Sequence, residues 1–261
     1  MTVSADALQK VVDNFIQRDT ERQPIEPVAA IATDLSVEEA YELQFLLLDR
    51  LVAAGENIIG RKGGFTTLEG QAAMGLPEPV YGHLFDSHLV TDGGTIDAAG
   101  LIRSVLECEI AFRLKEPLTG PGVTPDDVLA ATESVSAALE IVDFRNAGKP
   151  TVSEVLGYNV FARNFVVGST AVPVQGLDLI DLGVTLKKNG EVITTGSGKE
   201  VLGNPAASVA WLANKATSHD RPLQAGEVII AGTMTTPQPF QAGDHFEAIF
   251  EHLGMVSVRF S

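Results

Sequence analysis

The sequence predicts an α+β protein, because two helical patterns near the start are followed by many short apolar segments. Residues 4–18 and 36–55 carry apolar residues at helical spacing, and Ser36 with Glu39 forms a capping-box pattern. From residue 56 onward, short apolar runs alternate with Gly and Pro, which is typical of strands and turns. We therefore expect an N-terminal helical segment at 1–55 and a β-rich domain at 56–261.

Turn-forming residues separate the expected strands of this domain. These strands lie at about 58–61, 105–114, 139–143, 164–168, 182–187, 191–194, 227–231, 245–250 and 255–260. Asn189-Gly190 fits a type I′ hairpin turn between two of them. Further helices are expected at about 125–134 and 205–217, the second with Asn204 as N-cap and Pro205 at its first position.

Composition and charge narrow the possible partners. The 261 residues include 34 acidic and 18 basic ones, and the net charge of −16 argues against binding to nucleic acid or anionic membranes. No apolar run approaches the ~20 residues of a membrane span, and the first residues do not resemble a signal peptide. The single cysteine, Cys108, fits a reducing compartment and is expected to be a small buried side chain. We expect a cytoplasmic protein.

Carboxylates inside apolar strands are the main chemical signal. Glu107 and Glu109 in "ECEIAF" lie on one face of a strand, roughly 7 Å apart. Glu140 lies in a second apolar strand, "ALEIVDF", together with Asp143. Three carboxylates from two neighbouring strands would suit a hard divalent cation, Mg²⁺ or Mn²⁺. The alternatives are a solvated strand face or buried ion pairs with Lys and Arg.

A string of motifs then resembles one known family. In order, "IIGRKGGFTT", "PVYGHLF", "ECEIAF", "LTGPG", "LEIVDFR", "NGEVITTGSGKEVLGNPAASVAWLANK" and "GDHFEAIFEHLGMVSVRFS" resemble the 2-keto-4-pentenoate hydratase/4-oxalocrotonate decarboxylase branch of the fumarylacetoacetate hydrolase superfamily. The resemblance implies that 56–261 is a mixed β-roll catalytic domain, that the chain forms a homo-oligomer, and that its substrates are 2-oxo or 2-hydroxy-dienoic acids.

The resemblance also implies roles for individual residues. Glu107, Glu109 and Glu140 match the family's Mg²⁺ or Mn²⁺ ligands, and Lys62 matches its active-site lysine. Lys62 and Glu109 are therefore the candidate catalytic residues, with a surface lysine as the alternative for Lys62. The candidate substrate-binding residues are Lys62, Val80, Tyr81, Asn159 and Arg163.

The implied activity is hydration of a 2-hydroxy-2,4-dienoate, of the 2-keto-4-pentenoate type, to a 4-hydroxy-2-oxo acid in aromatic meta-cleavage catabolism. The main alternative is decarboxylation of a 4-oxalocrotonate-type substrate, and Val80 favours it because many hydratases carry an acid there. The stretch "GYNVFAR" at 157–163 also departs from the family pattern, whereas "ERQPIEPVAAI" and Trp211 resemble hydratase members. Acylpyruvate hydrolysis, or an inactive subunit associated with a sister pathway lyase, are further alternatives.

Overall fold

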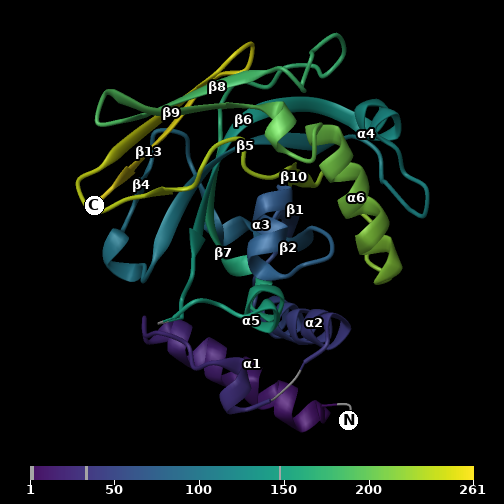
Figure 1. Ribbon diagram of the computed structural model, residues 1–261, viewed down its shortest axis with the longest axis vertical. Helices are drawn as coiled ribbons and strands as arrows, with labels where there is room; N and C mark the ends of the chain where they lie inside the picture. Colours follow the sequence, from purple (N-terminus) through teal and green to yellow (C-terminus); the bar gives the residue numbers. More distant parts are fainter. Residues whose placement is uncertain (1–2, 33–34, 147) are drawn as a thin grey trace.

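The computed structural model describes residues 3–32, 35–146 and 148–261, and its helices and two β-sheets form an α+β fold. Its α-helices are α1 (Ala5–Thr20), α2 (Val37–Ala53), α3 (Leu68–Met74), α4 (Pro125–Ala131), α5 (Val152–Gly157) and α6 (Pro205–Ser218). Helices α1, α2 and α5 gather at one end of the molecule, and the smaller sheet lies at the other end (Figure 1). The expected capping box of Ser36 and Glu39 is present at the start of α2.

The larger sheet is mixed and carries the long central strands. Its strand order is β2-β1-β10-β5-β6-β7-β3, and β11 pairs with β5. The strands are β1 (Ile58–Gly64), β2 (Val80–Phe85), β3 (Leu89–Val90), β5 (Ser104–Leu114), β6 (Thr132–Asp143), β7 (Ala162–Val167), β10 (Val228–Ile230) and β11 (Gln238–Pro239). The β1–β10 and β3–β7 pairs are parallel, and the central β5–β6 pair is antiparallel.

The smaller sheet packs one apolar face against the rest of the protein. Its order is β4-β13-β12-β8-β9, with β4 (Thr95–Ile96), β8 (Gly183–Lys188), β9 (Glu191–Ser197), β12 (His245–Phe250) and β13 (Gly254–Phe260). Alternate residues such as Phe246, Ala248 and Val256 are buried. The predicted hairpin turn is present, since both Asn189 (φ 54°) and Gly190 (φ 87°) adopt positive φ.

The two N-terminal helices share the core of the β-rich part of the chain. Gln44 on α2 is fully buried, and its amide donates to the backbone oxygens of Tyr81 on β2 and Leu156 on α5. A Cβ on Gly157 would lie 2.5 Å from Leu43, so α5 approaches α2 closely only because this position is glycine. The division at residue 55 stays a prediction.

One strand begins earlier than its sequence pattern indicates. The strand expected at 139–143 starts at Thr132, and the helix expected at about 125–134 ends at Ala131. The added strand residues include buried Ser136, Ala137 and Ala138. Small side chains fit a strand that is covered on both faces, but they carry weak β-propensity, and this hides the strand in the sequence.

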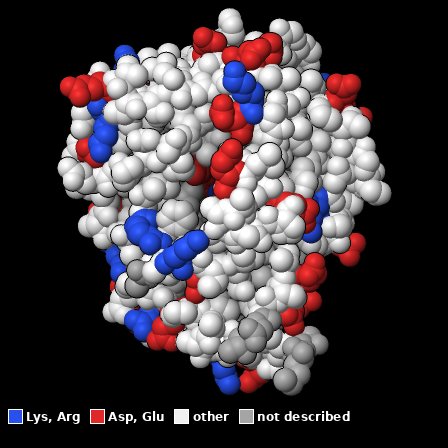
Figure 2. Space-filling model, in the orientation of Figure 1, with Lys and Arg blue, Asp and Glu red and all other residues white. Residues whose placement is uncertain are grey.

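Charged side chains are distributed in patches over the outside of the molecule (Figure 2). Figure 2 shows acidic groups scattered over one face and basic groups gathered mainly at its lower left. Among the described helices we find none with the length and apolar character that a membrane crossing needs.

Candidate active site

Three carboxylates converge on one face of the β5–β6 pair. Glu107 lies directly opposite Glu140 in the strand register, and Glu109 follows two residues along on the same face. One oxygen from each carboxylate lies within 4.8 Å of the others. The strand alternation seen in the sequence and the register of the two strands therefore build this cluster together.

Burial makes this cluster electrostatically costly. Glu109 and Glu140 are fully buried. Burial raises the pKa of Glu109 well above its usual range, and the carboxylates of Glu140 and Glu107 raise it further. Burial also raises the pKa of Glu107 to about 7, against the opposing effect of the Lys62 ammonium. The cluster thus favours a nearby positive charge.

Lys62 on β1 supplies part of that charge. Its Nζ lies 3.0 Å from Oε1 of Glu140, and its side chain is 2% exposed. Burial alone would lower the pKa of Lys62, but the carboxylates around it outweigh burial and hold the pKa above its usual value. The alternative of a surface lysine is wrong, because β1 carries this side chain into the centre of the larger sheet.

A backbone amide that sequence reasoning missed orients Glu109. The N–H of Gly232 donates to Oε2 of Glu109 over 2.6 Å. Gly232 has φ +120°, and a Cβ there would collide with Thr66, so this position requires glycine. The sequence signal is a glycine two residues after the end of the buried strand β10, which does not by itself indicate its partner.

The remaining oxygens of the cluster fit a divalent cation. Among the described residues, no hydrogen-bond donor reaches Oε1 of Glu109 or Oε2 of Glu140, and Oε1 of Glu140 has only the Lys62 ammonium beside it. When all three carboxyl groups are ionised, one ammonium leaves two negative charges uncompensated, and hard divalent cations prefer such oxygen ligands. Burial raises the pKa of the Cys108 thiol to about 12. Strand alternation places its side chain on the face opposite Glu107 and Glu109, so it is no competing ligand.

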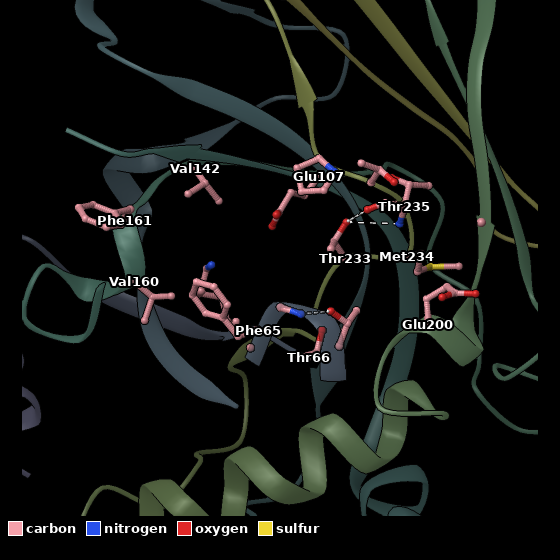
Figure 3. A pocket seen from close by; sticks show the side chains of 18 of the residues that line it. Phe65, Thr66, Glu107, Val142, Val160, Phe161, Glu200, Thr233, Met234 and Thr235 are labelled. Carbon is pink, nitrogen blue, oxygen red and sulfur yellow. Dashed lines mark hydrogen bonds between the residues drawn. The ribbon is translucent and has the colours of Figure 1, made fainter. Parts of the chain in front are cut away.

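The cluster opens into a cavity of about 520 Å³ with two chemically different sides. Figure 3 shows Val142, Val160 and Phe161 on one side and Thr233 and Thr235 on the other. Glu107 projects toward the space between them (Figure 3). Lys62 is the single cationic side chain among the described residues that line this cavity.

The structure places Tyr81 on the face of the larger sheet opposite Lys62. Lys62 pairs with Gly82 in the β1–β2 register, so the neighbouring Tyr81 points the other way. Its hydroxyl lies 2.9 Å from Nδ1 of His219, and its ring stacks on Tyr41. Tyr81 is fully buried in this aromatic group.

Val80 lies on the same face as Lys62, behind the cavity lining. A Cβ on Gly64 would lie 3.2 Å from Val80, 2.8 Å from Val160 and 3.8 Å from Nζ of Lys62. Position 80 is therefore a close neighbour of the buried ammonium group. A carboxylate at this position would lie next to that group, whereas the isopropyl group of Val80 keeps it apolar.

Asn159 and Arg163 line a second, smaller cavity rather than the one with the carboxylates. The side chain of Asn159 binds one residue of β2 at both ends: it accepts from the His83 N–H over 2.7 Å and donates to the His83 oxygen over 2.9 Å. Arg163 pairs with Asp19 on α1. The structure therefore does not bring these two residues to the carboxylate cluster.

The two hydrogen bonds between the Asn159 side chain and the His83 backbone, here called the Asn159 clamp, hold an unusual stretch of backbone. Asn159, Val160 and Phe161 all have positive φ, at 56°, 53° and 54°. This conformation is rare for branched or aromatic residues and requires support from its surroundings. Val160 and Phe161 line the main cavity, so the turn shapes its apolar side.

Comparison with known proteins identifies close relatives of the whole chain. The family model for the fumarylacetoacetate (FAA) hydrolase C-terminal region matches residues 58–261. A 2-hydroxyhexa-2,4-dienoate hydratase of Comamonas testosteroni is 40% identical over 231 residues, which cover 87% of this chain and 88% of that protein. A 4-oxalocrotonate decarboxylase of Pseudomonas sp. (strain CF600) is 35% identical over 260 residues, covering 99% of this chain and 98% of that protein.

A solved structure agrees closely with this fold. The 4-oxalocrotonate decarboxylase from Pseudomonas putida G7, complexed with magnesium and adipate, superposes with a TM-score of 0.96 at 33% identity. The match covers 100% of this chain and 99% of that one. These findings confirm the family resemblance and the fold class predicted from the sequence motifs. Relatives with each of the two leading predicted activities, hydratase and decarboxylase, are present.

Proposed function

Because the chain belongs to the fumarylacetoacetate hydrolase family, we propose that it is a divalent-metal-dependent lyase that hydrates a 2-hydroxy-2,4-dienoate to a 4-hydroxy-2-oxo acid. The observation that carries this proposal is one cavity that joins three carboxylates and a buried lysine to an apolar wall. This arrangement suits a substrate with one acidic end and one apolar end.

Glu107, Glu109 and Glu140 would hold Mg²⁺ or Mn²⁺ through their carboxylate oxygens. The magnesium in the structure of the decarboxylase relative supports this assignment. When bound, the cation would supply Lewis-acid stabilisation of the negative charge that develops on a 2-oxo acid. The Gly232 N–H fixes the orientation of Glu109 within this group.

Lys62 would bind the substrate carboxylate or move a proton at its Nζ atom. Its ammonium lies at the boundary between the carboxylates and the apolar wall, close to Val80 and Val160. Val142, Val160 and Phe161 would bind the unsaturated hydrocarbon end of the substrate and exclude water from it. Tyr81 would contribute indirectly, through the packing behind β1.

The charges on the cavity wall favour a substrate with a single carboxylate. Lys62 is the single cation among the described lining residues, and a second carboxylate on the substrate would be desolvated without a cationic partner. Decarboxylation of a 4-oxalocrotonate-type substrate is the second candidate. Val80 favours it, because an apolar site beside Lys62 promotes the loss of a charged carboxylate as neutral CO₂.

The experiment compares three substrates with purified, metal-loaded protein. We expect turnover of 2-hydroxypenta-2,4-dienoate and its 5-methyl homologue, without CO₂ release from 4-oxalocrotonate. CO₂ release from 4-oxalocrotonate without hydration of either dienoate would show that the protein is a decarboxylase and not a hydratase. Lys62→Met should bind metal and lose at least about 100-fold in turnover, whereas Lys115→Met, at an exposed position, should not. Normal kinetics in Lys62→Met would exclude Lys62 from the reaction.

We also infer that the protein works in the cytoplasm as a homo-oligomer, and that it can associate with a sister pathway lyase. Measurement of the molar mass in solution, alone and with a decarboxylase of the same pathway, tests both associations. A monomer that stays unassociated under assay conditions would contradict them.

A further inference from the structure

Glu200 lies where the main cavity meets another hollow in the surface. That hollow, here called the outer chamber, has a volume of about 390 Å³ and shares Thr66, Thr67 and Glu200 with the lining of the main cavity. Glu200 is the last residue of the 3₁₀ turn η5 (Gly198–Glu200), which follows strand β9. It is exposed, so solvent reaches its side chain. No step of the proposed reaction uses this carboxylate.

The backbone on both sides of Glu200 is hydrogen-bonded to neighbouring segments. The N–H of Gly198 donates to the Leu182 oxygen over 3.1 Å, and the N–H of Leu202 donates to the Thr66 oxygen over 2.9 Å. Thr66 belongs to the wall of both the main cavity and the outer chamber. The side chain of Glu200 therefore starts from a backbone that is fixed against the cavity wall.

The charges at this boundary are mainly negative. Glu69 and Glu200 line the outer chamber together with one basic residue, Lys199. Lys199 does not line the main cavity, whereas Glu200 does. Among the described residues, the Glu200 carboxylate has no ion-pair partner. An anionic group that reaches this end of the main cavity therefore meets an unpaired negative charge.

A substrate with a second carboxylate could extend in two directions inside the main cavity. Figure 3 shows Val142, Val160 and Phe161 on one side, and Thr233 and Glu200 on the other. The apolar side offers no polar partner, so a carboxylate placed there would lose its hydration without compensation. Hydroxyl groups on the opposite side could replace part of that hydration, but Glu200 lies on the same side. Exclusion of a second carboxylate from the hydroxyl side thus depends on Glu200.

We propose that Glu200 is a specificity-determining residue that disfavours substrates with a carboxylate at the far end of the chain. The inference rests on the proposed function, because it takes the first carboxylate of the substrate to bind near Lys62 and the three metal-binding carboxylates. Glu200 acts through its charge. Repulsion between two carboxylates close to solvent weakens binding by a moderate factor, and dissolved salt screens it.

The test measures binding of two saturated 2-oxo acids to Mn²⁺-loaded protein by calorimetric titration. The probes, 2-oxohexanoate and 2-oxohexanedioate, have chains of equal length and differ in the second carboxylate. We expect the wild type to bind the monoacid more tightly than the diacid. Glu200→Gln should strengthen binding of the diacid at least about threefold and change binding of the monoacid by less than about twofold. Glu69→Gln removes an acid that lines only the outer chamber, and it should leave the ratio of the two affinities unchanged.

A variant that keeps the charge and a series of salt concentrations separate charge from shape. Glu200→Asp should retain the preference for the monoacid. Raising KCl to about 0.5 M should reduce this preference in the wild type but not in Glu200→Gln. If both acids bind and the ratio of their affinities is the same in Glu200→Gln as in the wild type, the role of Glu200 is overturned while the proposed function stands. If neither acid binds to the Mn²⁺-loaded protein, the proposed function fails, and this inference fails with it.

Discussion

The side chain of Glu109 lies fully buried beside two other carboxylates, and burial, Glu140 and Glu107 together raise its pKa. Its Oε2 accepts from Gly232, while no donor of good geometry among the described residues reaches Oε1. A buried carboxylate with one free oxygen favours either a proton or a cation. Substitution of Glu109 by a neutral residue should therefore weaken metal binding but stabilise the metal-free protein.

We predict that Glu109→Gln weakens Mn²⁺ binding by at least about tenfold. Without metal, the same variant should unfold at a higher temperature than wild type, because a neutral amide removes like-charge repulsion from the cluster. Calorimetric titration and thermal unfolding with and without Mn²⁺ measure both effects. Glu133→Gln, at an exposed position of β6, is the control. Unchanged Mn²⁺ affinity in Glu109→Gln would remove Glu109 from the ligand set.

At the scale of elements, the turn Asn159–Phe161 is hydrogen-bonded to strand β2 and forms part of the apolar side of the cavity. Three consecutive positive φ angles are unfavourable for these residues, so the two hydrogen bonds between Asn159 and His83 must hold the turn in place. Gly82 makes the contact possible, since a Cβ there would lie 2.7 Å from the Asn159 oxygen. The clamp therefore fixes Val160 beside Lys62 and Phe161 between the two cavities.

Two substitutions separate the clamp from the backbone conformation. Asn159→Ala loses both hydrogen bonds and places alanine at positive φ, which should lower the free energy of unfolding by about 3 kcal/mol. Asn159→Gly loses the same bonds but tolerates the conformation, so its loss should be about 1 kcal/mol smaller. Urea unfolding of both variants measures the difference. Equal stabilities of the two variants would contradict a left-handed turn at this position.

Local patterns in the sequence predicted the carboxylate cluster, because strand alternation alone places Glu107 and Glu109 on one face. Glu140 followed from its place in a second apolar strand, and the family resemblance pointed to Lys62; the structure brings both to the same place. The positions of Tyr81 and Asn159 could not be predicted in this way. They depend on the β1–β2 register and on a turn of rare backbone conformation, which are set by long-range packing.

At the scale of the whole molecule, the core runs without interruption from the N-terminal helices through the larger sheet to the smaller one. Buried ionisable side chains nevertheless lie on both faces of the β1–β2 pair. Lys62 lies on the cavity side, and Arg61 with His83 lies on the other. Arg61 is neutralised by Glu227 at 2.9 Å. Among the described residues, neither ring nitrogen of His83 has a partner, so His83 is buried as a neutral group.

This buried histidine makes the stability of the whole protein depend on pH. Burial lowers the pKa of His83 well below 6.5, and the charges of Arg61 and Arg221 lower it further. Below about pH 6.5 the unfolded chain therefore binds a proton at His83 that the folded protein does not, and the free energy of unfolding falls as the pH falls. Above that pH neither state binds the proton, and this contribution to the slope vanishes.

We predict that the stability of His83→Leu depends less on pH, because its unfolded chain lacks the proton that His83 takes up in the wild type. Between pH 6 and pH 5 its free energy of unfolding should fall less steeply than that of wild type, by up to about 1.4 kcal/mol per pH unit. At pH 7.5 it should be at least as stable as wild type, because leucine replaces two buried nitrogens that lack partners. Urea unfolding of both proteins at several pH values tests this. Parallel pH profiles would mean that His83 gains its proton in the folded protein as readily as in the unfolded chain.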